Sequence, residues 1–106
     1  MITYASVLTA LGDPTRRRIF EILRQGPRAV GEIAGELPVS RPAVSQHLKV
    51  LRRTGLVTEK VVGTRHIYYP APSGLEPLRH YLDAFWSQAL DALQAFAEDP
   101  QQEEQQ

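Results

Sequence analysis

The chain has 106 residues, of which 42% are hydrophobic, and its 12 basic and 12 acidic side chains give a formal net charge of zero. This length fits one globular domain with a modest core, which burial against a second subunit would enlarge. The chain has no cysteine, no apolar run of membrane-spanning length and no basic leader before an apolar segment, so we exclude disulfides and thiolate metal sites and expect a cytoplasmic protein without a membrane partner.

The charges are divided unevenly along the chain. Up to Pro72 there are eleven Lys and Arg residues against five Asp and Glu, a net charge of +6, and after it one against seven, a net charge of −6. A basic half of this kind is typical of a nucleic-acid-binding surface, with an acidic half that serves assembly. Attraction between the two halves of one chain is the other explanation of the pattern.

Two helices are predicted at the start of the chain. Thr3 is a suitable N-cap for a short helix with an apolar patch at Val7, Leu8 and Leu11. Gly12-Asp13-Pro14 then ends this helix and begins a second one, which runs to about Gln25. The apolar stripe of the second helix is formed by Ile19, Ile22 and Leu23.

A helix-turn-helix unit is predicted in the middle of the chain. Residues 30–37 keep a helical apolar period, and Pro38-Val39 forms a short turn. Ser40 caps the next helix, predicted over 41–54, and Gly55 ends it. Its apolar face consists of Val44, Leu48 and Leu51, and its other face offers hydroxyls, an amide and cations. Such groups bind base edges and phosphates in a major groove, although a solvated helix face has the same composition.

A β-hairpin is predicted over 56–70. Both arms are rich in β-branched and aromatic residues, and Gly63-Thr64 matches a two-residue type II′ turn. In this register Val62 faces Arg65, Lys60 faces Ile67 and Thr58 faces Tyr69. A hairpin that follows a recognition helix is a wing, and Arg65 near its tip is suited to contact a DNA backbone or minor groove unless it is simply solvated.

A long last helix is predicted to begin at Ser73-Gly-Leu-Glu76, interpreted as a capping box. Its apolar residues step by three and four from Leu75 to Phe96, which predicts burial against a symmetric partner with help from the first helix. We expect residues 1–98 to form one DNA-binding and dimerisation domain and residues 99–106 to form a disordered acidic tail. The predicted dimerisation residues are Val7, Leu8, Leu11, Leu78, Leu82, Phe85, Trp86, Ala89 and Leu93.

Four segments together resemble the ArsR family of bacterial winged-helix repressors, and most of all its SdpR-like branch. They are ALGDPTRRRIFEIL at 10–23, VGEIA at 30–34, SRPAVSQHLKVLRRTGLV at 40–57, and Tyr68-Tyr69. The resemblance implies a mainly α, α+β winged helix in the order helix, helix, helix, recognition helix, hairpin wing and long C-terminal helix. It also implies a homodimeric, sequence-specific repressor that binds an inverted-repeat operator in double-stranded DNA and is released by a signal such as an unknown small-molecule inducer.

The chain departs from the family pattern at its metal sites. The cysteines that some members carry on the helix before the recognition helix are absent from 33–36, and the last helix has only His80 and Asp83 where metal-sensing members have more ligands. We therefore expect no metal and no cofactor, and an exposed or interfacial His80. Pro38 stands where many members have glycine, which requires a turn with negative φ at this position.

Roles for individual side chains follow from their positions on the predicted recognition helix and wing. Arg41, Ser45 and Gln46 lie near the N-terminal end of the helix and are expected to contact bases. Ser40, Lys49 and Arg65 are expected to contact the DNA backbone. His47, Arg17 and Lys60 are secondary candidates, because His47 borders the apolar face and Arg17 could equally be solvated.

The sequence also bears on two other function classes. The sequence contains no catalytic constellation, so an enzyme is not expected. A winged-helix module that binds another protein and no operator is the alternative, and weak, salt-independent retention of DNA would favour it.

Overall fold

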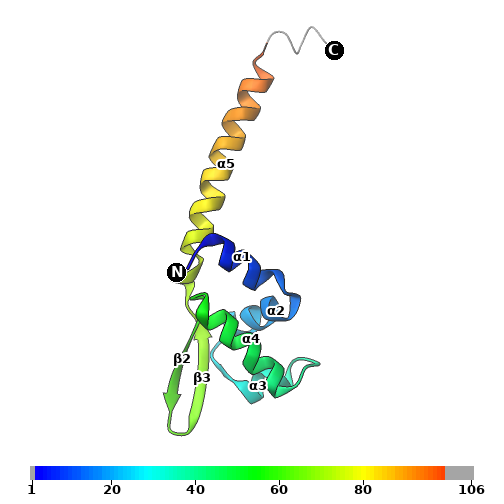
Figure 1. Ribbon diagram of the computed structural model, residues 1–106, viewed down its shortest axis with the longest axis vertical. Coiled ribbons are helices and arrows are strands. Elements are labelled where there is room, and N and C mark those ends of the chain that lie inside the picture. The colour runs from blue at the N-terminus through cyan, green and yellow to red at the C-terminus, as the bar shows by residue number, and fades with distance from the viewer. Residues whose placement is uncertain (1, 100–106) are drawn as a thin grey trace.

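The computed structural model describes residues 2–99 and is mainly helical. Figure 1 shows a body of short helices, with a hairpin projecting from one end and a long helix from the other. The helices are α1 (Tyr4–Gly12), α2 (Pro14–Arg24), α3 (Val30–Gly35), α4 (Arg41–Arg53) and α5 (Glu76–Ala97), with a 3₁₀ turn, η1 (Pro72–Leu75); the strands are β1 (Arg28–Ala29), β2 (Val57–Val62) and β3 (Arg65–Pro70). The predicted winged-helix class is confirmed.

Three helices begin at the predicted N-caps. The side chains of Thr3, Asp13 and Ser40 each accept a hydrogen bond from the backbone N–H three residues later, at 3.1, 2.8 and 3.3 Å. Gly55 follows α4 with a φ of +77°, the left-handed conformation that ends a helix without strain for glycine. These four helix ends were therefore predictable from local chemistry.

The core lies where the two predicted apolar stripes meet. Ile19, Ile22 and Leu23 of α2 are buried, as are Val44, Leu48 and Leu51 of α4. Val7 of α1 is fully buried in this same core. Its assignment to a dimer interface was wrong, because a side chain with no exposed surface cannot contact a second subunit; the i, i+1, i+4 pattern did not distinguish the inward residue from the outward Leu8.

The hairpin has the predicted register. Val62 lies opposite Arg65, Lys60 opposite Ile67 and Thr58 opposite Tyr69. Gly63 has a φ of +64° and Thr64 does not have a positive φ, as a type II′ turn requires. The sheet also has a third strand that the sequence analysis missed, since β1 is only two residues long and pairs with β3.

Two predicted helix boundaries were wrong. The third helix ends at Gly35 and not at Leu37, because Pro38 disfavours a helical conformation in the residue before it. The capping box at Ser73 does not form. Ser73 lies inside η1, where the N–H of Gly74 donates to the carbonyl of Ala71 at 2.9 Å, and α5 begins only at Glu76.

The long helix α5 contributes no buried residue to the fold. Its foot packs against α1, where the rings of Tyr4 and Tyr81 stack with centroids 4.2 Å apart. Within residues 2–99 no helix is long and apolar enough to cross a membrane. The predicted disordered tail lies, apart from Asp99, outside the described residues.

Candidate nucleic-acid interface

The side of α4 opposite the core carries a row of exposed residues spaced by four, three and four. This row consists of Pro42, Gln46, Lys49 and Arg53, and no hydrogen bond or ion pair engages the last three within residues 2–99. The buried positions 44, 48 and 51 fix this orientation, because they turn the opposite face of the helix outward. The row therefore presents an amide and two cations that are available to a ligand.

A second group of predicted residues lines an open concavity of about 580 Å³. Its walls come from the start of α3, the start of α4 and the first residues of β3. Arg41 and Ser45, expected to contact bases, and Arg65, expected to contact the backbone, all lie in this concavity with His66. The structure thus brings together three predicted residues that are up to 24 positions apart in the sequence.

Arg41 lies over a glycine of α3. A Cβ built on Gly31 would lie only 2.0 Å from Nη2 of Arg41, so the guanidinium occupies the space that a side chain at 31 would fill. The group that approaches α3 most closely at this glycine is a side chain from the start of α4. The position of this predicted base contact depends on Gly31.

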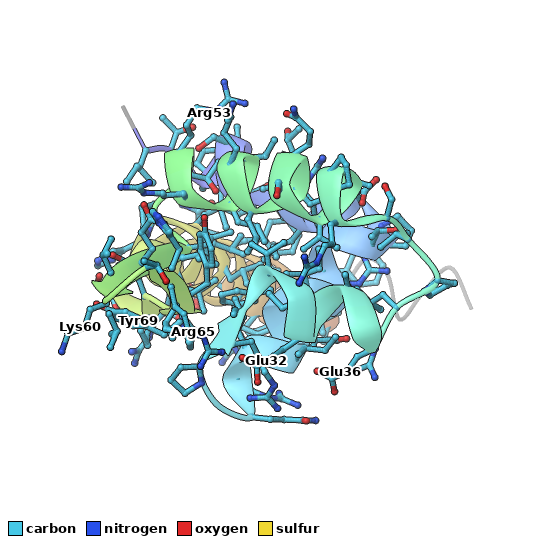
Figure 2. The ribbon with its side chains drawn as sticks, turned by 90° about the horizontal axis from the view of Figure 1, so that it is seen from below. Glu32, Glu36, Arg53, Lys60, Arg65 and Tyr69 are labelled. Carbon is cyan, nitrogen blue, oxygen red and sulfur yellow. The ribbon has the colours of Figure 1, made fainter. Side chains whose placement is uncertain are left out.

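Arg65 is tied to α3 by an ion pair. Its Nη2 donates to Oε1 of Glu32 at 2.9 Å, and the same oxygen accepts from the N–H of Ala29, the N-cap of α3, at 3.0 Å. Figure 2 shows Arg65 beside Glu32, whereas Lys60 extends from the hairpin away from α4. The pair is more than half exposed on both sides, so it is weak and can exchange for a phosphate.

Glu59 connects the wing with the end of α4. Its Oε1 accepts from Nη1 of Arg52 at 2.6 Å, and its Oε2 lies 3.1 Å from Nδ1 of His66. Hydrogen bonding from His66 is the main reason that the pKa of Glu59 lies below its ordinary value. Burial, reinforced by a hydrogen bond to Glu59, raises the pKa of the Tyr68 phenol. This network was not predicted from the sequence.

Two arginines at the start of α2 donate hydrogen bonds to backbone carbonyls at the end of α1. Nε of Arg16 donates to the carbonyl of Ala10 at 2.8 Å, and Nη1 of Arg17 donates to the carbonyl of Leu11 at 2.8 Å. Cations at a helix C-terminus are favourable, so these side chains offset the charge at that end. The remaining donors of Arg17 keep it a secondary candidate.

His47 lies on the flank of α4 that faces the start of α2. It is half-buried, with Nδ1 at 3.9 Å from Oδ2 of Asp13. The hydrogen bond from the Arg16 N–H is the main reason that the pKa of Asp13 lies below its ordinary value. This half-buried position, away from the outward row, favours packing over DNA contact as the role of His47.

Arg53 is a candidate that the sequence analysis did not single out. It completes the outward row, and Figure 2 shows it extending from the end of α4. The spacing of Gln46, Lys49 and Arg53 by three and four would have identified it. Ser40, in contrast, uses its oxygen as an N-cap acceptor, and its hydroxyl hydrogen is left for a phosphate.

Six of the nine predicted dimerisation residues form an exposed apolar face on α5 and α1. Phe85, Trp86 and Leu93 are each at least 60% exposed, and Leu82 and Leu8 about half exposed. Ala89 is also exposed, whereas Leu78 and Leu11 are half-buried and pack against the core. His80 and Asp83 are exposed, and residues 2–99 contain no cluster of three or more groups that could hold a metal.

Known proteins are similar to this chain in sequence and in fold. The pattern described as "Bacterial regulatory protein, arsR family" matches residues 13–59. The HTH-type transcriptional regulator Rv2034 of Mycobacterium tuberculosis is 56% identical over 93 residues, which cover 85% of this chain and 87% of that protein. The transcriptional repressor SdpR of Bacillus subtilis is 36% identical over 64 residues, 60% of this chain and 70% of the relative.

Solved structures agree with the sequence relatives. An ArsR-like transcriptional regulator from Rhodococcus sp. RHA1 has a TM-score of 0.76 and 34% identity, over 91% of this chain and 93% of that one. A homodimeric winged helix-turn-helix DNA-binding domain, Mb0332 from Mycobacterium bovis, has a TM-score of 0.64 and 31% identity, over 83% and 82% of the two chains. These relatives are transcription regulators and not enzymes, and the chain belongs to the ArsR family of bacterial regulatory proteins.

Proposed function

We propose that this protein is a cytoplasmic transcriptional repressor that binds an inverted-repeat operator in double-stranded DNA as a homodimer. The observation that carries the proposal is the outward row of α4, whose polar residues have no partner in the described chain and whose apolar opposite face is fully buried. A helix held in this way can enter a major groove without disturbing the core.

Roles are assigned by position on this surface. Arg41, Ser45 and Gln46 contact base edges, because they lie in the first half of α4 and offer a guanidinium, a hydroxyl and an amide. Ser40, Lys49 and Arg65 contact phosphates, and we add Arg53 to them. The wing then lies over the adjacent backbone or minor groove, with Lys60 as a secondary contact. These assignments make residues 1–98 one DNA-binding and dimerisation domain.

The homodimer follows from the exposed face of α5. The exposed apolar face that includes Phe85, Trp86 and Leu93 is the kind of surface that marks a protein–protein contact, because monomeric proteins rarely leave contiguous apolar patches in water. A second copy related by a two-fold axis buries the same face on both subunits, and Leu8 of α1 lies next to it. Two-fold symmetry of the protein implies two-fold symmetry of the operator.

Footprinting on the DNA upstream of the protein's own gene tests the proposal. Wild type should protect an inverted repeat, and Gln46→Ala should lose or alter that protection because the amide is on the outward row. Gln25→Ala, at the end of α2, is the matched control and should protect the repeat as wild type does. An inducer added to this assay would be detected as loss of protection.

Retention of DNA that stays weak and constant between about 50 and 200 mM salt would contradict the proposal, because phosphate contacts make binding steeply salt-dependent. That result would favour a winged-helix module that binds protein.

A further inference from the structure

Two adjacent arginines at the end of α4 have different environments. Nη1 of Arg52 donates to Glu59 at 2.6 Å. Arg53, the next residue, has no hydrogen bond or ion pair within residues 2–99. Both side chains are exposed enough to reach a nucleic-acid backbone, so the difference between them is the carboxylate that holds Arg52.

This carboxylate is well shielded and held from several sides. The Glu59 side chain is 14% exposed, compared with 57% for Arg52. His66 and Tyr68, both on β3, also hydrogen-bond to it. Because an arginine–carboxylate hydrogen bond between charged groups is stronger than one between neutral groups, a shielded Glu59 with two further partners can keep Arg52 in place.

We infer that Glu59 keeps Arg52 off the phosphate backbone and so lowers the affinity of the protein for DNA of any sequence. This inference rests on the proposed function. Non-specific binding is almost entirely electrostatic, whereas base contacts add the preference for an operator. A freed cation therefore strengthens binding to operator and non-operator DNA alike, because a phosphate contact does not depend on the base sequence.

The lowered pKa of Glu59 supports this role, because the carboxylate stays ionised at neutral pH. Ser45, Lys49 and Arg52 line one hollow together with Tyr68, so a released Arg52 guanidinium would lie next to Lys49 and Ser45, which are already assigned to DNA. Glu59 thus acts on the edge of the same surface that binds DNA.

Glu59→Gln tests the inference by measurement of affinity for random-sequence duplex DNA at several salt concentrations. We expect the slope of log affinity against log salt to steepen by about 0.9 per protomer, and affinity at 0.1 M salt to rise roughly eight-fold per protomer. The double variant Glu59→Gln, Arg52→Gln should return to the wild-type slope. Glu21→Gln, which removes an acid paired with Arg18 on α2, is the matched control and should leave the slope unchanged.

A second comparison avoids dependence on the folding of the Glu59 variant. Arg53→Gln should reduce the slope by about 0.9 per protomer, and Arg52→Gln by less than half as much. Equal reductions in these two variants would show that Arg52 already contacts phosphate and would overturn the inference.

The two proposals fail in different ways. A flat salt dependence of wild type overturns the proposed function, and this inference with it. A steep wild-type slope that Glu59→Gln does not change overturns this inference alone.

Discussion

Gly31→Ala should impair base recognition without unfolding the protein. The added Cβ would lie 2.0 Å from Nη2 of Arg41, and ordinary contact begins near 3.4 Å, so the guanidinium must move by more than 1 Å. The clash is with the end of a flexible side chain and not with backbone, so the chain can relieve it by changing the rotamer of Arg41. The exchange of glycine for alanine in a helix itself favours folding by about 0.5–1 kcal/mol.

Loss of a bidentate base contact removes about 1–3 kcal/mol of discrimination, which is roughly 5-fold to 150-fold per half-site. Competition between an operator and single-base variants, followed by fluorescence anisotropy, measures this loss, and thermal unfolding measures stability. Gly35→Ala is the matched control, because it lies on the same helix and its added Cβ meets nothing within 4 Å. If the Gly31→Ala and Gly35→Ala variants discriminate equally well between the operator and its single-base variants, then Gly31 does not position Arg41 for a base contact.

Three further predictions address the dimer, the backbone contacts and the cap of α2. Phe85→Glu should yield monomers in sedimentation velocity, since it places a charge on the exposed apolar face. Ser87→Glu, on the opposite side of α5, should stay dimeric. If both variants are dimers, the assigned interface is wrong. Lys49→Gln should weaken binding to all duplexes alike and reduce the slope of log affinity against log salt by about 0.9 per protomer. Arg79→Gln, on α5, should change neither the affinity nor this slope. A loss of affinity confined to one sequence would contradict a phosphate contact. The pKa of Asp13 is lower in the folded protein than its ordinary value of 3.8. The ionised carboxylate therefore stabilises α2 fully at any pH above about 3.8, and this stabilisation is lost as the pH falls through the lowered pKa of the folded protein. Asp13→Asn keeps a cap acceptor, so its melting temperature should depend less on pH between about 5 and 2.5 than that of wild type, and an equal dependence would show that Asp13 does not contribute.

Much of the fold was predictable because its determinants are local. Thr3, Asp13 and Ser40 cap helices through bonds to residues three positions away, and Gly63 fixes the hairpin turn and hence its register. The outward face of α4 followed from the period of its buried residues. The candidate site was thus predicted wherever a position on one helix or one hairpin determined it.

The errors arise where distant segments decide the outcome. Val7 and Leu8 are neighbouring aliphatic residues, and only the packing of α1 in the core shows that the first faces inward. The strand at 28–29 exists only because β3 pairs with it. Glu59 of β2 forms an ion pair with Arg52 of α4, and no spacing in the sequence predicts that contact between two different elements.

The crossing of η1 over the end of α4 explains how dimerisation can control DNA binding in the proposed repressor. A Cβ on Gly74 would lie 2.0 Å from the carbonyl oxygen of Gly55, and the N–H of Ala71 donates to the carbonyl of Leu56 at 2.8 Å. Both contacts are between backbone atoms, so rotation of a side chain cannot relieve a movement of η1 relative to the end of α4. In the proposed dimer α5 would be held by the partner, and recognition helices that enter successive major grooves lie about 34 Å apart. Since α5 begins directly after this crossing, we expect the packing of the two α5 helices to affect the position of α4, and with it the spacing of the recognition helices, through the contacts at Gly74 and Gly55.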